Sequence, residues 1–391
     1  MQNELPSTLV APIIAAVSVI SFNFYHESDS SSESEDDDNI TLQEKKIIFS
    51  IMKNNIRENK IIEKLNGYVK RVIPKYTRDI FKEHFRVYPI TFQMILTLIG
   101  PALSVTPVKF GKKPIDAKKQ LYIALWFMAT PDSYRSVCVK FGVGKATAFR
   151  AVRRVTYALH CIAPKFIKWP SEHASIVIEG FKNISSIPNV IGAIDGTHIK
   201  IKAPTNDAIS YINRKGFASL NLQVVCDSTG LFTHCYAGQP GSVHDARVFR
   251  NSPVANFLNM PEIFFPNGCH IIGDAAYPIH PHMMVPFRDK GHLTHKQTNY
   301  NYCLSSTRIV VERGIGQLKI RFRILLDCLP LTDLGRIPEF IIACCVLHNI
   351  CILQNDVFPV SDECNEELSS ILCNNNIHNN NSQIVSLHYV K

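Results

Sequence analysis

The sequence predicts an α/β protein, a mixed sheet flanked by helices, which is preceded by an all-α domain with a helix-turn-helix-type segment. Between residues 42 and 165, apolar side chains recur at helical spacing, which predicts the all-α domain. Between residues 185 and 355, short apolar runs alternate with turns and amphipathic segments, as in a sheet with helices on its faces. Hydrophobic residues make up 46% of the 391 and charged residues 19%, so a fibrous or mostly disordered chain is excluded.

The two ends of the chain are expected to lie outside these domains. Residues 1–41 combine an apolar segment with an acidic, disordered linker, and the segment is shorter than the roughly 20 residues that span a bilayer, so no membrane is expected. Residues 356–391 turn asparagine-rich and are expected to be a disordered tail. Without the seven acids between Glu27 and Asp38, the formal net charge of +9 becomes +16. A body this basic favours a polyanionic partner such as nucleic acid.

The twelve cysteines form no Cys-x-x-Cys pair, and several of them lie inside apolar runs. A cysteine in such a run behaves as a small hydrophobic residue. A disulfide framework or a zinc ribbon is therefore not expected, and a reducing compartment is favoured.

Within the all-α domain, residues 101–114 are expected to form a loop, and Asp116 is expected to cap a buried helix. Residues 132–155 then have a helix-turn-helix layout, with a turn from Gly142 to Gly144. The second helix carries residues that can reach phosphates or base edges, Lys145, Thr147, Arg150, Arg153 and Arg154. Lys145, Arg150 and Arg153 are the candidate DNA contacts among them. A structural helical hairpin with a solvated basic face has the same pattern, so both interpretations stay open.

The second domain begins with an apolar run that predicts a buried strand ending at Asp195. Two apolar runs on either side of the turn Asp227–Gly230 predict a hairpin. A further apolar run ends at Gly273 and Asp274. The expected elements are strands at 190–194, 220–226, 231–236 and 269–272 and helices at 242–249, 306–325 and 333–352.

Two carboxylates, Asp195 and Asp274, stand where apolar strands are expected to end, each beside a glycine. An unpaired carboxylate next to a buried strand is unfavourable, so it needs an ion-pair partner, a hydrogen-bond donor or a metal. Taken alone, Asp195 or Asp274 is better explained as an acid that caps a turn at the end of a strand. The helix at 306–325 adds Glu312, which shares a face with residues that would suit a phosphate backbone, namely Arg308, Gly316, Lys319 and Arg323. Together the three acids can hold divalent cations through hard oxygen ligands.

Six motifs follow one another in order in the part of the chain between about residues 85 and 352. They are Val190-Ile-Gly-Ala-Ile-Asp-Gly-Thr-His-Ile199, Tyr211-Ile-Asn-Arg-Lys-Gly216, Pro240-Gly-Ser-Val-His-Asp-Ala-Arg-Val-Phe249, Gly273-Asp-Ala-Ala-Tyr-Pro278, Val310-Val-Glu-Arg-Gly314 and Ala343-Cys-Cys-Val-Leu-His-Asn-Ile350. In this order they resemble the PIF/Harbinger transposases and the nucleases derived from them, which are DDE superfamily endonucleases. Any single motif would be weak, but six in order are specific.

The resemblance implies a ribonuclease-H-like fold whose DDE triad of catalytic carboxylates is Asp195, Asp274 and Glu312. It also implies cleavage of DNA phosphodiester bonds with two Mg²⁺ or Mn²⁺ ions held by these acids. Asp245 is a further candidate metal ligand, although an aspartate at a helix start is also a common cap. The residues expected to neutralise DNA phosphates, besides those of the helix-turn-helix, are Arg214, Lys215, Lys319 and Arg323.

The sequence departs from the family pattern in two places, neither of which removes a carboxylate. Ala275 and Ala276 stand where the family has Ser-Gly, and Gly314 and Ile315 stand where it has Ala-Phe. The resemblance further implies a Myb/SANT-like DNA-binding partner and a nuclear location, with the cytoplasm as a second compartment. Oligomeric state stays open. So do two alternatives to a nuclease, a domesticated DNA-binding protein that has lost cleavage and a regulatory scaffold that uses the two ends of the chain.

Overall fold

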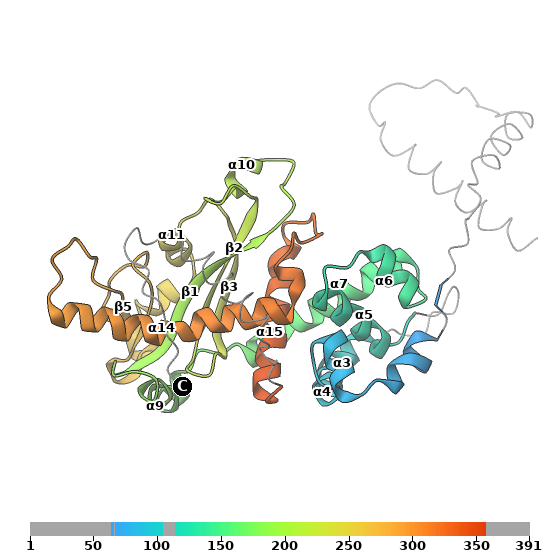
Figure 1. Cartoon of the computed structure of the whole chain (residues 1–391), viewed down its shortest axis with the longest axis horizontal. Helices are drawn as coiled ribbons and strands as arrows, with labels where there is room; N and C mark the ends of the chain where they lie inside the picture. The colour runs from blue at the N-terminus through green and yellow to red at the C-terminus, as the bar shows by residue number, and fades with distance from the viewer. Residues whose placement is uncertain (1–63, 66, 105–113, 357–391) are drawn as a thin grey trace, which may run out of the picture. The chain divides into compact units, whose positions relative to one another are not determined.

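The computed structural model describes residues 64–65, 67–104 and 114–356 (Figure 1). The chain divides into two compact units, Met1–Ile61 and Ile62–Lys391, and every described residue belongs to the second unit. The expectations for residues 1–41, for the start of the all-α domain and for the tail beyond Asp356 lie outside the described residues.

The first part of the described chain is helical, as the apolar periodicity predicts. Asp116 caps α5, because its carboxylate accepts the Lys119 amide at 2.6 Å. The expected loop at 101–114 is wrong at its start, since α4 continues to Leu103 with Pro101 inside it, where the proline removes one helical hydrogen bond without ending the helix. The helical elements before the sheet are η1 (Tyr68–Val72), η2 (Ile73–Lys75), α3 (Arg78–Phe85), α4 (Pro89–Leu103), α5 (Ala117–Ala129), α6 (Tyr134–Lys140), α7 (Lys145–Cys161), α8 (Ala163–Phe166), η3 (Ser171–His173) and α9 (Ala174–Lys182).

A five-stranded mixed sheet in the order β3-β2-β1-β4-β5 forms the second part, which confirms the predicted fold class. β1, β2 and β3 are antiparallel neighbours, whereas β4 and β5 continue the sheet in parallel from β1. The predicted hairpin is present as β2 and β3. The strands are β1 (Val190–Lys200), β2 (Ser219–Cys226), β3 (Phe232–Pro240), β4 (His270–Ile272) and β5 (Met283–Met284).

Three expected element boundaries in this region are wrong. β3 continues to Pro240, four residues beyond its expected end. β1 does not end at Asp195 but pairs with β2 as far as Lys200, so the acid lies in mid-strand. The helix expected from Ser242 begins only at Asp245, with His244 as its N-cap. The shorter helices of this part are α10 (Ala208–Tyr211), α11 (Asp245–Arg250), α12 (Pro253–Phe257), α13 (Pro261–Phe264) and η4 (Pro266–Gly268).

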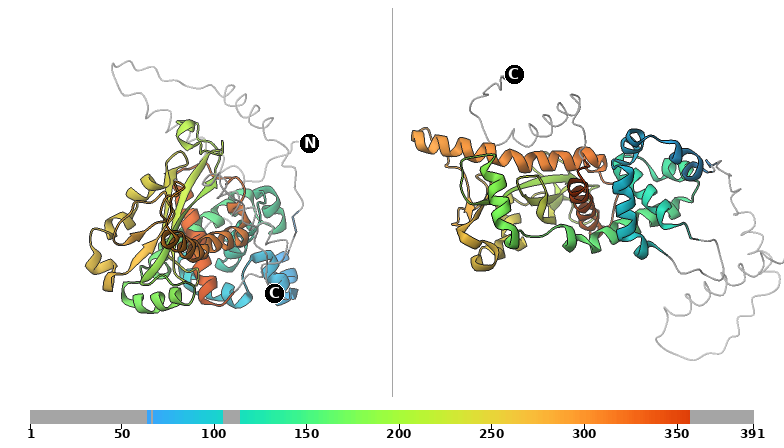
Figure 2. Two further views of the ribbon diagram at one scale, coloured as in Figure 1. Left: turned by 60° about the vertical axis from the view of Figure 1, so that its left-hand side comes forward. Right: turned by 90° about the horizontal axis from the view of Figure 1, so that it is seen from below.

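Two long helices complete the described chain, α14 (His295–Arg321) and α15 (Arg336–Leu353), with η5 (Arg323–Leu325) between them. α14 begins before the expected Ser306, because Thr294 and Gln297 form a capping box that starts it among polar residues without apolar periodicity. Figure 2 shows α14 lying lengthwise beside the strands, and it packs on β1 and β2.

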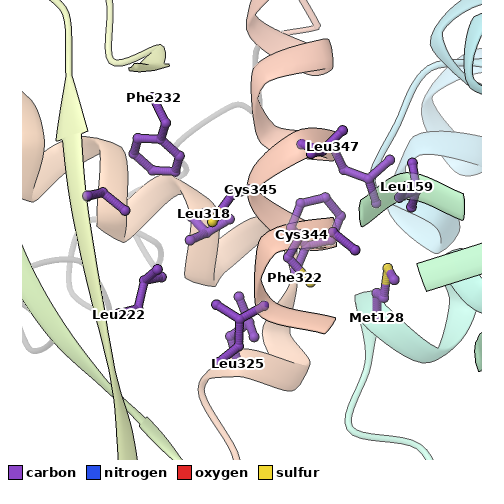
Figure 3. Packing of buried hydrophobic residues seen from close by; sticks show 14 of the residues in the cluster. Met128, Leu159, Leu222, Phe232, Leu318, Phe322, Leu325, Cys344, Cys345 and Leu347 are labelled. Atoms are coloured by element: carbon purple, nitrogen blue, oxygen red, sulfur yellow. The ribbon is translucent and has the colours of Figure 1, made fainter. Parts of the chain in front are cut away.

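α15 joins the helical part of the chain to the sheet. It packs against β3 on one side and α7 on the other. Figure 3 shows Leu222 and Phe232 of the sheet and Met128 and Leu159 of the helical part in one hydrophobic cluster around it. Among the described helices, α15 alone has the length and hydropathy of a membrane span, but most of it is buried in this core. The two domains predicted at 42–165 and 185–355 therefore share one core.

A buried ion cluster around Asp356 connects α3, α4 and α14 at one edge of this core. The Asp356 carboxylate accepts hydrogen bonds from the Tyr88 amide at 2.6 Å and the Thr91 hydroxyl at 2.7 Å, and it pairs with Lys82 at 2.7 Å and Arg321 at 3.4 Å. Burial raises the pKa of Asp356, but these bonds outweigh burial and hold it below its usual value. The expected disordered tail from 356 is thus wrong for its first residue. We call these five residues the Asp356 cluster.

Candidate active site

The pairing of β1 with β4 brings two of the predicted acids near each other. The strands run parallel with Ala193 opposite Ile272; Asp195 follows two residues later in β1, and Asp274 follows two residues later, just beyond the end of β4. The two carboxylates are close enough that the charge of Asp274 raises the pKa of Asp195, in addition to the larger effect of burial.

The glycines next to these acids make room for side chains of the protein itself. A Cβ on Gly196 would lie 2.9 Å from Asp245 Oδ1, and a Cβ on Gly273 would lie 2.8 Å from the Tyr277 ring. Both distances are shorter than real Cβ contacts tolerate. The two glycines therefore let α11 and the loop after β4 approach β1 closely.

The third acid reaches this place from α14. Glu312 Oε1 accepts a hydrogen bond from Arg308 Nη2 at 2.9 Å, and the same nitrogen lies 3.9 Å from Asp195 Oδ2. Arg308 therefore bridges two members of the predicted triad. Its interaction with Asp274, which raises its pKa, links it to the third.

Asp245 joins the other three acids as the first residue of α11. The cap of that helix is His244, and no side-chain cap bond is formed. Within the described residues, no hydrogen bond to the Asp245 carboxylate is found. The four carboxylates, Asp195, Asp245, Asp274 and Glu312, come from four separate segments, and we call them the acidic site.

The electrostatics of the acidic site favour protonated acids. Burial raises the pKa of Asp195 to about 7, and the charges of Glu312 and Asp274 add to it, while Arg308 only partly opposes them. Burial likewise raises the pKa of Glu312, again against Arg308. Burial and the charge of Asp274 raise the pKa of Asp245. When all four acids are ionised, the site would therefore hold more negative charge than Arg308 balances.

Sequence reasoning missed two residues of this site. Arg308 was placed on a face suited to DNA, whereas its guanidinium is mostly buried between Asp195 and Glu312. Tyr277 was part of a motif but was given no role. Its hydroxyl is buried and makes no hydrogen bond within the described residues, and burial together with Asp245, Asp195 and Asp274 raises its pKa well above the usual value.

Two members of the expected DNA-facing row on α14 are also buried. Lys319 donates from Nζ to Thr197 Oγ1 at 2.7 Å and to the His198 carbonyl at 3.2 Å, and burial lowers its pKa to about 8. Its assignment as a phosphate contact is therefore wrong, because the ammonium is used to hold α14 to β1. Gly316 is buried as well, so it presents no open surface to a phosphate backbone. Arg323 lies in η5, beyond the end of α14.

Arg214 and Lys215 lie on a loop that is fixed next to the acidic site. Asn213 is buried, donates from Nδ2 to Ser219 Oγ at 3.0 Å and accepts the Lys215 amide at 2.9 Å. Arg214 contacts the imidazole of His244, next to Asp245. We call residues 213–216 the basic loop.

The helix-turn-helix layout predicted for residues 132–155 is present as α6 and α7, with Gly142 in the left-handed region at a φ of 62°. The side chains of Lys145 and Arg150 are exposed. Arg153 is partly buried and lines a small hollow with Glu339 and Phe340 of α15. Lys145 and Arg150 are therefore the most exposed of the predicted DNA contacts on α7, whereas Arg154 donates from Nη2 to the Leu103 carbonyl at 2.8 Å.

No group of three His, Cys, Asp or Glu side chains within the described part of the chain is arranged to hold a metal ion. In the acidic site, Arg308 stands between the carboxylates of Asp195 and Glu312. The four carboxylates nevertheless supply only hard oxygen donors, which is the chemistry that Mg²⁺ and Mn²⁺ prefer.

Comparison with known proteins gives the same family. The family model described as DDE superfamily endonuclease matches residues 194–349, which include all four acids. The protein named "Putative nuclease HARBI1" of Rattus norvegicus is 33% identical over 264 residues, which is 66% of this chain and 72% of that protein. "Protein ALP1-like" of Arabidopsis thaliana is 27% identical over 315 residues, 74% of this chain and 75% of that protein.

A protein of Xenopus laevis with the same name as the rat relative is 28% identical over 309 residues, 76% of this chain and 86% of its own. No solved structure matches the chain. The matches to the rat, frog and plant proteins extend beyond the acidic site to most of each chain. The chain belongs to the nucleases of the DDE superfamily that are derived from Harbinger transposases.

Proposed function

We propose that this protein is a divalent-metal-dependent DNA endonuclease that cleaves phosphodiester bonds at the acidic site, with Asp195, Asp274 and Glu312 as its catalytic acids. The observation that supports this most is the convergence of four partly buried carboxylates, two of which pair with Arg308, with pKa values raised at three of the four. Excess negative charge in a protein interior is unfavourable. A positive ligand that binds there would explain why the charge is kept.

The donor set fits Mg²⁺ or Mn²⁺. Asp195, Asp274 and Glu312 would hold the metal, and Asp245 is the fourth candidate ligand. When bound, such ions supply an activated water and stabilise the leaving oxygen of the phosphodiester. The carboxylates then serve as anionic ligands, and their raised pKa values fall back toward the ordinary range because a cation favours their charged forms.

The basic loop supports a DNA substrate. Arg214 and Lys215 lie beside the acids, and Asn213 fixes the loop that carries them. Cations next to a cluster of acids offset its repulsion of a phosphate backbone, so the substrate can approach. Lys145 and Arg150, which are exposed on α7, are the remaining candidate contacts. Binding through such cations weakens as the salt concentration rises.

The decisive experiment is cleavage of plasmid DNA and of candidate terminal-repeat DNA by the purified full-length chain, with Mn²⁺, with Mg²⁺ and with chelator. Asp195→Asn, Asp274→Asn and Glu312→Gln keep the side-chain volume and remove an anionic ligand, so each should reduce metal-dependent cleavage to background. Glu179→Gln is the matched control, because Glu179 is an exposed carboxylate paired with Lys182 on α9. Cleavage that persists in all three variants would contradict the proposal.

The position of Arg308 favours a second candidate function. Its ion pairs with Asp195 and Glu312 partly neutralise the acids without any metal. A domesticated protein that binds DNA and no longer cuts it would keep such a pair. In that case the parent would bind DNA with a steep salt dependence, and neither metal would produce nicked plasmid.

A nuclear location and a Myb/SANT-like partner belong to the same proposal. A DNA substrate requires access to the nucleus, and imaging of the tagged full-length chain tests the location directly. Co-purification from nuclear extract with a DNA-binding protein of the Myb/SANT type would support the partner. A chain found only in the cytoplasm would contradict the location.

A further inference from the structure

The hydroxyl of Tyr277 has no structural role that the fold explains. The side chain is 4% exposed, its ring packs edge-on against Phe249 with centroids 5.6 Å apart, and it covers Gly273. Phenylalanine would make the same ring contacts. The hydroxyl, however, is buried without a hydrogen-bond partner among the described residues. A buried unsatisfied donor destabilises a fold, so its presence calls for a ligand or a partner that arrives later.

The Asp245 carboxylate, a hydrogen-bond acceptor, lies near the Tyr277 hydroxyl. The position that a Cβ on Gly196 would occupy is 2.9 Å from Asp245 Oδ1 and 3.8 Å from the Tyr277 hydroxyl. Both oxygens therefore border the small space that Gly196 leaves open beside β1. Asp245 accepts no hydrogen bond from the described residues, and its charge is the acid charge that acts most strongly on Tyr277.

We propose that Tyr277 is a positioning residue for the acidic site, whose hydroxyl donates a hydrogen bond to the Asp245 carboxylate when the acids hold a divalent cation. The inference rests on the metal dependence proposed above. A carboxylate that binds a metal needs its orientation fixed by a hydrogen bond from outside the metal's ligands. Tyr277 is suited to this because its ring is already locked by Phe249 and Gly273, so little further ordering is required.

The test is the affinity of the metal-free, full-length protein for Mn²⁺, measured by calorimetry without DNA. Tyr277→Phe should weaken Mn²⁺ binding roughly ten-fold. It should leave the melting temperature of the metal-free protein unchanged or slightly raised, because an unsatisfied hydroxyl is removed. Tyr300→Phe is the matched control. The Tyr300 hydroxyl donates a hydrogen bond to the Val285 carbonyl at 3.3 Å, and neither residue belongs to the acidic site. It should leave Mn²⁺ affinity unchanged.

A double variant tests whether Asp245 is the acceptor of the Tyr277 hydrogen bond. If the hydroxyl acts through Asp245, then Tyr277→Phe should have no further effect on Mn²⁺ affinity in a chain that already carries Asp245→Asn. A full ten-fold effect in that background would overturn Asp245 as the acceptor.

The failures of the two proposals are distinguishable. A parent chain that binds no Mn²⁺ overturns the metal dependence and this inference with it. A parent that binds Mn²⁺ while Tyr277→Phe binds it equally well overturns this inference alone. A Tyr277→Phe chain with a lowered metal-free melting temperature and unchanged Mn²⁺ affinity assigns the hydroxyl to the fold and also overturns it.

Discussion

The Asp356 cluster, which is buried, and the acidic site, which is partly buried, are two groups of charges that α14 connects, and they are built in opposite ways. In the Asp356 cluster, one carboxylate meets two cations and two neutral donors, and the pKa of Asp356 is held low. In the acidic site, four carboxylates share one nearby cation, Arg308, which pairs with Asp195 and Glu312, and the pKa of Asp195 rises to about 7. The first arrangement stabilises the apo fold, whereas the second leaves charge for a ligand to satisfy.

The largest expected effect comes from breaking the balanced cluster. Asp356→Ala should lower the free energy of unfolding by about 3–5 kcal/mol, because it removes the buried carboxylate that pairs with Lys82 and Arg321 and accepts hydrogen bonds from Tyr88 and Thr91. Chemical denaturation of the full-length chain measures this. Asp333→Ala, which removes an exposed pair with Arg336, should cost no more than about 1 kcal/mol. Equal losses in the two variants would show that the Asp356 cluster contributes no more than a surface pair.

The acidic site should respond in the opposite direction when one acid is neutralised. Without metal at pH 8, Asp195→Asn should be as stable as the parent or more stable, because it removes a charge that burial disfavours. Added Mn²⁺ should raise the melting temperature of the parent more than that of the variant. A variant that melts lower than the parent without metal would mean that Asp195 stabilises the fold.

The two regions also differ in their pH windows. A raised carboxyl pKa stabilises the fold at low pH, and this contribution is lost as pH rises through the folded value, which is about 7 for Asp195. A lowered pKa stabilises the fold above the ordinary value near 4, and this contribution is lost on acidification, as expected for Asp356. In chelator, the stability difference between parent and Asp195→Asn should therefore change between about pH 4 and pH 7. A difference that stays constant across this range would contradict the raised pKa.

The smallest effect is expected from a cation that borders the acidic site. Arg214→Gln should reduce the slope of log affinity for DNA against log salt by about one, with unfolding unchanged, because this side chain is exposed. Affinity measured at several salt concentrations tests this. Lys182→Gln, an exposed cation on α9, is the control and should leave the slope unchanged. An unchanged slope for Arg214→Gln would remove this residue from the DNA contacts.

The order of elements could be predicted because apolar periodicity is a local property of the sequence. The sequence pattern predicts three local features that the structure contains: the hairpin β2–β3, the helix cap at Asp116 and the paired helices α6 and α7. The end of β1 was not predicted, because Asp195 to His198 interrupt the apolar run of the strand, and their pairing with β2 is a long-range contact. The start of α14 was missed for a related reason, since its first turns have no apolar stripe and depend on a capping box.

The acids could be predicted from motifs, but the surroundings that tune them could not. A lysine on a helix face looks the same in a sequence whether it meets DNA or the backbone of β1, as Lys319 does. Asp356 looked like the start of a polar tail because composition is averaged over a segment, whereas its burial depends on Lys82 more than 270 residues earlier. The roles of Arg308 and Tyr277 could not be predicted, because they depend on contacts between residues far apart in the sequence.

The unbroken length of α14 has a consequence for how the chain opens. Glu312, which belongs to the acidic site, and Arg321, which belongs to the Asp356 cluster, lie on this one helix, and Lys319 fastens it to β1 between them. The turns around Glu312 cannot unfold without disturbing the turn that carries Arg321, because helical hydrogen bonds continue from one to the other. A ligand that holds Glu312 therefore also slows opening at the junction with α3 and α4, so amide hydrogen exchange there reports on events at the acids.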